Sequence, residues 1–231
     1  SPLLPPSPGG RGVGGEGGES SRSNLVLLAT ALSGWGSLCR LASLVQSHAD
    51  ALSFDYLAKN TTGLLCLSGG LRGLATRLVQ RNQTEEAERW LATLADLFPD
   101  RLYIELQTHT PQDAASNSRL ARLGRMLKLP LVATHNIHYL SPEQSDLQRV
   151  VTAIRLIRTV NELPPDVTAP SGAYFLTPAE MQVRFEHYPS ALAATNEIAA
   201  RCQLELPLDQ PHFPQVDLPP GNGRGIHIFQ A

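Results

Sequence analysis

Residues 129–155, LPLVATHNIHYLSPEQSDLQRVVTAIR, contain a strand, a turn and a helix, and they decide the fold class of this chain. The first seven residues form an apolar run with the length of a buried strand. Ser141 and Pro142 then suit the N-cap and the first turn of a helix. That helix carries apolar residues at helical spacing, namely Leu147, Val150, Val151, Ile154 and Ile157.

Three further strands precede residue 129, and helical patterns follow each of them. The strands are predicted at 24–30 (NLVLLAT), 63–70 (GLLCLSGG) and 101–107 (RLYIELQ). Four helices are predicted after these strands. One contains an apolar stripe that begins at Trp35, one spans 71–80, one has Thr84 as its N-cap, and one spans 114–127. This alternation predicts an α/β fold, with a parallel sheet or barrel covered by helices. Functional sites in such folds lie at the C-terminal strand ends, which here means near Ser68, His109 and His138.

The C-terminal part is predicted to be a helical extension. A Pro-rich stretch at 164–171 precedes Thr177 and Glu180, which have the spacing of a capping box. The helix that follows would bury Met181, Val183 and Phe185, and a last helix is expected around 191–202. The predicted division is a disordered Gly/Pro-rich leader (1–23), the α/β region (24–160), the helical extension (161–206), and a linker and tail (207–231).

Composition excludes several classes of protein. The chain has 231 residues, 42% of them hydrophobic, which is enough for a buried core. Its 19 basic and 21 acidic residues give a net charge of -2, without the basic excess of a dedicated nucleic-acid binder. Three widely spaced cysteines indicate neither a disulfide framework nor a zinc knuckle. No apolar run is long enough for a membrane span or a signal peptide, so a cytoplasmic location is expected.

Four blocks of this sequence, read together, are similar to one known domain. They are NLVLLATALSGWGSLCRLASLVQ (24–46), GLLCLSGGLRG (63–73), RLYIELQTH (101–109), and residues 129–155. They resemble the polymerase-and-histidinol-phosphatase (PHP) domain of bacterial DNA polymerase III alpha subunits, most closely the error-prone branch. The resemblance covers about 24–214 and continues through YFLTPAEMQVRFEHYPSALAATNEIAARCQLEL (174–206). It implies a fragment truncated at both ends, because the family's opening ligand motifs should precede Asn24. The leader and the tail GRGIHIFQA suggest a frameshifted or wrongly bounded reading frame.

The resemblance implies an incomplete, distorted β/α barrel of the PHP type, similar to a TIM barrel. In intact family members the strand ends hold Zn, Mn or Mg ions through His, Asp, Glu and Cys side chains. Residue by residue, a ligand His of the family aligns with Asn24, a ligand Cys with Gly70 and a ligand Asp with Asn136, while His138 is retained. Two of these replacements remove a donor, and the third substitutes a neutral amide for a carboxylate.

The residues themselves support the same conclusion about metal binding. On a strand with period two, Asn136 and His138 face one side and His135 faces the other. An Asn carbonyl cannot offset the charge of a divalent ion as a carboxylate does. His138, even with His109, is too few donors for a closed site, so we expect neither tight metal binding nor another cofactor.

Simpler interpretations exist for each candidate. Glu105 reads as a hydrogen-bonded strand carboxylate, and His138 as a hydrogen-bonded histidine at a strand end. The glycines at 69–70 with Arg72 could form an anion-binding loop, but a tight turn is the commoner structure.

Three functional hypotheses follow. The first is a scaffold domain in DNA replication or translesion synthesis, inactive by itself, whose partner is the remainder of a polymerase alpha subunit (a nucleotidyltransferase) and which meets DNA only indirectly. The second is a metal-dependent phosphoesterase or 3′-5′ exonuclease. The third, an independent nucleic-acid binder, is disfavoured by the charge balance. No contact with a membrane is expected.

Overall fold

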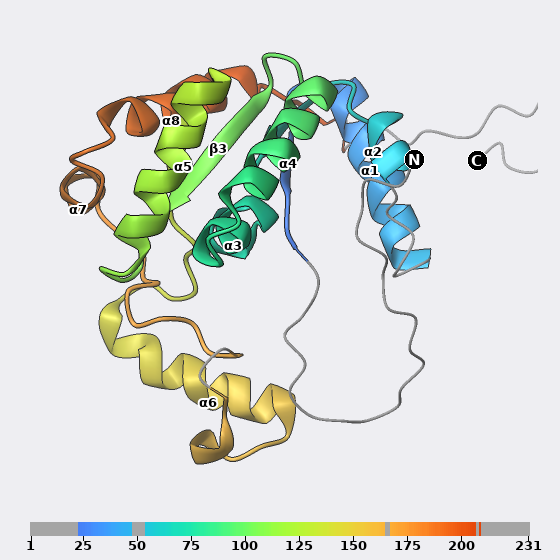
Figure 1. Ribbon diagram of the computed structural model, residues 1–231. Helices are drawn as coiled ribbons and strands as arrows, with labels where there is room; N and C mark the ends of the chain where they lie inside the picture. Colours follow the sequence, from blue (N-terminus) through green and yellow to red (C-terminus); the bar gives the residue numbers. More distant parts are fainter. Residues whose placement is uncertain (1–22, 48–53, 165–166, 207, 209–231) are drawn as a thin grey trace, which may run out of the picture.

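In the described part of the chain, four strands are joined by helices (Figure 1). The computed structural model describes residues 23–47, 54–164, 167–206 and 208. The strands are β1 (Val26–Ala29), β2 (Leu64–Leu67), β3 (Leu102–Gln107) and β4 (Leu131–Thr134). The α-helices are α1 (Leu32–Ser47), α2 (Phe54–Ala58), α3 (Leu74–Gln80), α4 (Thr84–Leu97), α5 (Asp113–Leu127), α6 (Ser145–Leu156), α7 (Pro178–Arg184) and α8 (Pro189–Arg201). Short 3₁₀ turns lie at η1 (Gly70–Arg72), η2 (Pro142–Gln144) and η3 (Val160–Glu162).

These elements confirm the α/β class, all four predicted strands and the two helices predicted between residues 177 and 202, which are α7 and α8. The leader predicted at 1–23 and the tail predicted at 207–231 lie outside the described residues, apart from Ser23 and Leu208. None of the described helices combines the length and the apolar character that crossing a membrane requires. The cysteines Cys39, Cys66 and Cys202 are all free thiols.

The strands form one sheet in the order β1-β2-β3-β4. Strands β2, β3 and β4 are parallel, but β1 pairs antiparallel with β2, with Val26 opposite Leu67. The parallel pairing predicted for the whole sheet is therefore wrong at β1. In the described part of the chain, α1 and α2 lie between β1 and β2. After them the chain returns to the C-terminal end of β1, where β2 begins. There the Thr30 N–H donates to the Gly63 carbonyl at 2.9 Å. Within the described residues the sheet is open, with β1 and β4 at its edges.

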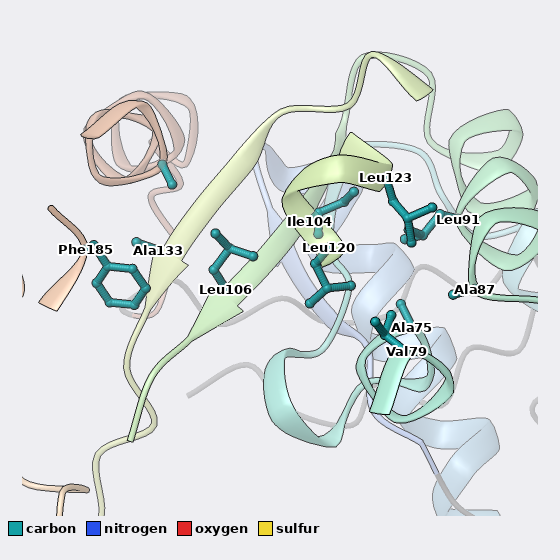
Figure 2. Close-up of a cluster of buried hydrophobic side chains, with 11 residues drawn as sticks. Ala75, Val79, Ala87, Leu91, Ile104, Leu106, Leu120, Leu123, Ala133 and Phe185 are labelled. Atoms are coloured by element: carbon teal, nitrogen blue, oxygen red, sulfur yellow. The ribbon is translucent and has the colours of Figure 1, made fainter. Parts of the chain in front are cut away.

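One face of the sheet packs against helices α3, α4 and α5. Ile104 and Leu106 of β3 lie between these helices and β4 (Figure 2). The same cluster is completed by Ala75, Val79, Ala87, Leu91, Leu120, Leu123, Ala133, Phe185 and Ala191. Toward β1, a second cluster joins β2 to α1, α2 and α4 through Leu41, Leu57, Leu64, Cys66, Leu94, Phe98 and Leu102. Because every second strand residue belongs to this face, the alternation of a pleated strand builds this layer.

The opposite face is covered by α8. Its core consists of strand residues Leu65, Leu67, Tyr103 and Val132 packed against Ala194 and Ile198. Burial on both faces explains why the strands read as continuous apolar runs rather than as an alternation. On β3, Tyr103 lies under α8, whereas Glu105 and Gln107 follow on the same face and line a cavity at the strand ends. The packing of α8 therefore leaves this end of the sheet open for a site.

Several apolar residues that the sequence assigned to helix core faces are exposed. Trp35 is 42% exposed, because α1 packs on the sheet through Leu41 on another side of the helix. Met181 of α7 and Phe185 directly after it pack in the core as predicted, but Val183 is 72% exposed. The large apolar residues predicted to form the core face of the helix after Pro142 are also exposed, namely Leu147, Val150, Val151 and Ile154 of α6 and Ile157 directly after it. Figure 1 shows the cause, since α6 lies apart from the helices that cover the sheet.

Of the three predicted helix caps, one is correct, one caps a 3₁₀ turn and one is displaced by a residue. The Thr177 hydroxyl accepts from the Glu180 N–H, and the Glu180 carboxylate accepts from the Thr177 N–H at 2.7 Å, as a capping box requires. Ser141 forms the same arrangement with Gln144, but it caps η2 rather than α6 itself. Thr84 is the first residue of α4 and not its cap, a shift of one residue.

We expect the central core to dominate stability. Leu106→Ala removes a fully buried side chain between β3 and the helices, and it should lower the free energy of unfolding by about 2–5 kcal/mol. Ile154→Ala on α6, where the side chain is 72% exposed, should cost less than about 1 kcal/mol. Urea unfolding followed by circular dichroism measures both changes. Equal losses in the two variants would contradict this assignment of the core.

Candidate functional site

The C-terminal ends of β2, β3 and β4 surround a cavity of about 260 Å³. Four of the five predicted site residues line this cavity, namely Asn24, His109, Asn136 and His138. Its other lining residues are Val26, Gly69, Leu71, Arg72, Glu105, Gln107, Thr168, Ala169 and Pro170. The fifth predicted residue, Gly70, is buried between two residues of the wall. The fold therefore gathers side chains that are more than 100 positions apart in sequence.

Glu105 is the only carboxylate among the described residues that line the cavity, and both its oxygens are engaged. One oxygen accepts from the Gly69 N–H at 3.1 Å. The other accepts from the Gln107 amide at 3.0 Å and from the Thr134 hydroxyl. The Glu105 N–H donates to the Ser68 hydroxyl at 2.9 Å. With 4% of its surface exposed, Glu105 is the hydrogen-bonded strand carboxylate that the sequence predicted.

At Gly70 the backbone itself disfavours a side chain. Its φ is +55°, in the left-handed region that only glycine adopts freely. A Cβ added there would collide with the side-chain amide of Gln107. That amide is fixed in place, because its oxygen accepts from the Leu71 N–H at 3.2 Å. Gln107 thus fills the space into which a residue 70 side chain would point.

Asn136 and His138 lie together as predicted, but not on a strand. Strand β4 ends at Thr134, and the chain continues in an irregular conformation before Tyr139 bridges to Tyr174. The Asn136 side-chain nitrogen lies 3.1 Å from His138 Nε2. Partial burial and the nearby Arg72 guanidinium lower the pKa of His138. His138 is therefore a neutral, hydrogen-bonded ring at neutral pH.

His135, on the other side of this segment, stacks on His109. The ring centroids are 4.4 Å apart, and the ring planes are inclined by 43°. Burial, followed by the charges of His109 and Arg184, lowers the pKa of His135 to about 4. Burial also lowers the pKa of His109. The stacked imidazoles are therefore both uncharged at neutral pH.

This donor set does not fit a tightly held divalent metal ion. In the part of the chain that the structure describes, no three His, Cys, Asp or Glu side chains are grouped closely enough to share one. The oxygens of Glu105 already accept hydrogen bonds, and Asn136 offers only a neutral amide. Arg72 adds a positive charge beside His138, which opposes a second cation. The absence of tight metal binding itself stays a prediction.

Sequence reasoning missed three residues of this site, Gln107, Thr134 and His135. Gln107 follows Glu105 by two positions, so strand periodicity places both on one face. Thr134 pairs with Gln107 in the register of β3 and β4, which the sequence does not specify. The stacking of His135 depends on the loop that carries His109, and no sequence signal points to it.

Comparison with known protein families gives one match within the chain. A model of the PHP domain matches residues 12–109. This range contains β1, β2 and β3 together with Asn24, Gly70, Glu105 and His109. It also extends into the Gly-rich segment that the sequence assigned to a leader.

Similarity to curated proteins extends over most of the chain. An error-prone DNA polymerase of Symbiobacterium thermophilum is 31% identical over 226 residues, which covers 89% of this chain and 21% of that protein. DNA polymerase III subunit alpha of Aquifex aeolicus is 27% identical over 85% of the chain and 18% of its own length. The corresponding subunit of Neisseria meningitidis is 36% identical over a stretch that covers 75% of this chain and 16% of that protein. The chain thus spans about a fifth of the length of these relatives. Residues 12–109 thus match the PHP domain, and the chain is homologous to part of bacterial DNA polymerase III alpha subunits and error-prone DNA polymerases.

Proposed function

We propose that this chain is a structural PHP domain of a DNA polymerase III alpha subunit and has no catalysis of its own. The observation that carries the proposal is the state of Glu105. A catalytic metal site needs carboxylates free to coordinate, whereas both oxygens of Glu105 hold the strand ends together. Its role in this chain is to join β2, β3 and β4.

The substituted ligand positions support the same proposal. Asn24 and Asn136 are neutral, and Gly70 offers no side chain while Gln107 takes its space. Each change removes negative charge or a donor atom, and Arg72 adds positive charge. The site has therefore moved from the chemistry of cation binding toward a hydrogen-bonded structural network.

We further infer that the open sheet is part of an incomplete, distorted β/α barrel. Its parallel strands β2 to β4 carry helices on their outer face, as barrel strands do. On this view residues 24–160 form the partial barrel, and residues 161–206 form an extension. Helix α8 of the extension shares a core with β2, β3 and β4, so the two parts stabilise each other.

The proposed partner is the remainder of an alpha subunit, in DNA replication or translesion synthesis. Proteins named as alpha subunits and error-prone polymerases are about five times as long as this chain, so most of their polypeptide lies outside it. Polymerase chemistry would reside in that remainder, and the domain would meet DNA only through it.

A metal-dependent phosphoesterase or 3′-5′ exonuclease is the alternative. One observation favours it, namely that His109, His138 and Glu105 still line one cavity at the strand ends. Activity would require Glu105 to exchange its hydrogen bonds for a metal ion.

Metal content and activity separate the two proposals. We expect the purified chain, loaded with Zn²⁺ or Mn²⁺ and dialysed, to retain far less than one ion per molecule by elemental analysis. It should also hydrolyse neither p-nitrophenyl phosphate nor single-stranded DNA with Mn²⁺ present. Stoichiometric metal, or activity that His138→Ala abolishes, would establish the alternative.

The Glu105 network should contribute measurably to stability. Thr134→Val keeps the shape of the side chain but removes a hydroxyl donor to a buried carboxylate. We expect a loss of about 1–3 kcal/mol in the free energy of unfolding. Thr93→Val on α4, whose hydroxyl bonds only to the Arg89 carbonyl, is the matched control and should cost less than about 1 kcal/mol. If Mn²⁺ stabilised the native chain but not Glu105→Gln, the carboxylate would be a metal ligand instead.

The stacked histidines predict how stability depends on pH. In the folded chain the pKa of His135 lies at about 4, below its ordinary value of 6.5. Between these values the unfolded chain binds a proton that the folded chain does not, so stability should fall as the pH decreases from 6.5 to 4. Urea unfolding at several pH values should show that the free energy of unfolding falls less steeply with decreasing pH in His135→Gln than in the native chain. A slope insensitive to His135→Gln would contradict the assignment.

A further inference from the structure

A second, larger cavity adjoins the strand-end site and contains α6 in its wall. Its volume is about 620 Å³, within the range of pockets that bind small molecules. It shares Arg72, His138 and Ala169 with the smaller cavity. The rest of its wall is formed by residues that the strand-end site does not use, namely Tyr139, Leu140, Gln144, Leu147, Gln148, Val151, Thr152, Arg155 and Val167.

Two arginines give this cavity an unbalanced positive charge. Arg72 comes from η1 and Arg155 from the last turn of α6. The cavity wall contains no Asp or Glu among the described residues, and neither guanidinium has a hydrogen bond or ion pair there. A guanidinium presents a planar fork of N–H donors that matches the oxygens of a phosphate group. Two guanidiniums of this kind therefore line one cavity.

The remaining wall of the cavity has a different character. Leu147 and Val151 lie one turn apart on α6, and they are 59% and 56% exposed. Val167 and Leu140 add further apolar surface. Covering such exposed aliphatic side chains with a flat, weakly hydrated ring removes apolar surface from water, which favours binding. The cavity thus combines an apolar wall with a cationic end.

We propose that this cavity binds a nucleotide, with Arg72 and Arg155 holding the phosphate and the base lying against Leu147 and Val151. A nucleotide has both parts that the cavity selects for, an anionic phosphate and a flat base with weakly hydrated faces. The inference goes beyond the structural role proposed above, and it requires neither a metal ion nor catalysis. The phosphate group is the shared chemistry of a free nucleotide and of a DNA strand.

Calorimetric titration of the full 231-residue chain in EDTA tests the proposal with three probes: inorganic pyrophosphate, thymidine 5′-monophosphate and a ten-residue oligothymidylate. We expect Arg72→Gln and Arg155→Gln each to weaken binding of the monophosphate by about tenfold or more, the effect of losing a charge-assisted hydrogen bond. Arg149→Gln is the matched control, because Arg149 lies on the same helix, pairs with Asp146 and is absent from the cavity wall. It should bind as the native chain does.

The apolar wall and the source of the phosphate are tested in the same series. Leu147→Ala should weaken the binding of thymidine monophosphate but leave the binding of pyrophosphate unchanged, since only the monophosphate carries a base. Tighter binding of the oligothymidylate, still dependent on both arginines, would identify a DNA strand as the ligand, and equal or weaker binding would identify the free nucleotide. The proposal fails if no probe binds at millimolar concentration, if Arg149→Gln weakens binding as much as Arg155→Gln, or if binding requires a divalent metal. Circular dichroism of each variant confirms that the fold is intact.

Discussion

The hydrogen bonds of Glu105 organise the end of the sheet on which the rest of the site depends. This carboxylate accepts from the N–H of Gly69 after β2 and from Thr134 at the end of β4, while its own strand is β3. Three strand ends are thereby held by one buried group. A carboxylate in this position is stabilised only if donors surround it, because an unpaired buried charge is costly. Gln107 supplies one of those donors, and its side chain in turn occupies the space next to Gly70.

This arrangement has a direct chemical consequence. Metal coordination and internal hydrogen bonding compete for the same carboxylate oxygens, and in this chain the hydrogen bonds engage them. The histidines nearby are neutral, and His138 lies close to Arg72. The carboxylate of Glu105 is thus engaged in the structure of the sheet, and the guanidinium of Arg72 lines the same cavity. The proposed scaffold role and the proposed nucleotide site in the arginine-lined cavity are therefore compatible.

Helix α6 connects the two features. Helix α6 lies apart from the main helices (Figure 1), and its exposed apolar side chains lie outside the principal core. Leu147 and Val151 nevertheless line the larger cavity together with Arg155. Large exposed apolar surfaces on soluble domains commonly mark contact sites. The periodic sequence of α6 predicts an apolar stripe, but it does not indicate whether that stripe packs against a core. In the structure the stripe is exposed.

The sequence alone determined the α/β class, the positions of all four strands, the cap at Thr177 and the residues that converge at the strand ends. These depend on local periodicity, on turn chemistry and on the rule that parallel strands end at a common edge. Only the tertiary structure decided that β1 is antiparallel, that Trp35 and the stripe of α6 are exposed, and that Glu105 is saturated by Gly69 and Thr134. Each of these depends on where a helix returns the chain, or on which distant groups it brings within bonding distance. That information lies in the packing of the whole chain, because Glu105 is 36 positions from Gly69 and 29 positions from Thr134.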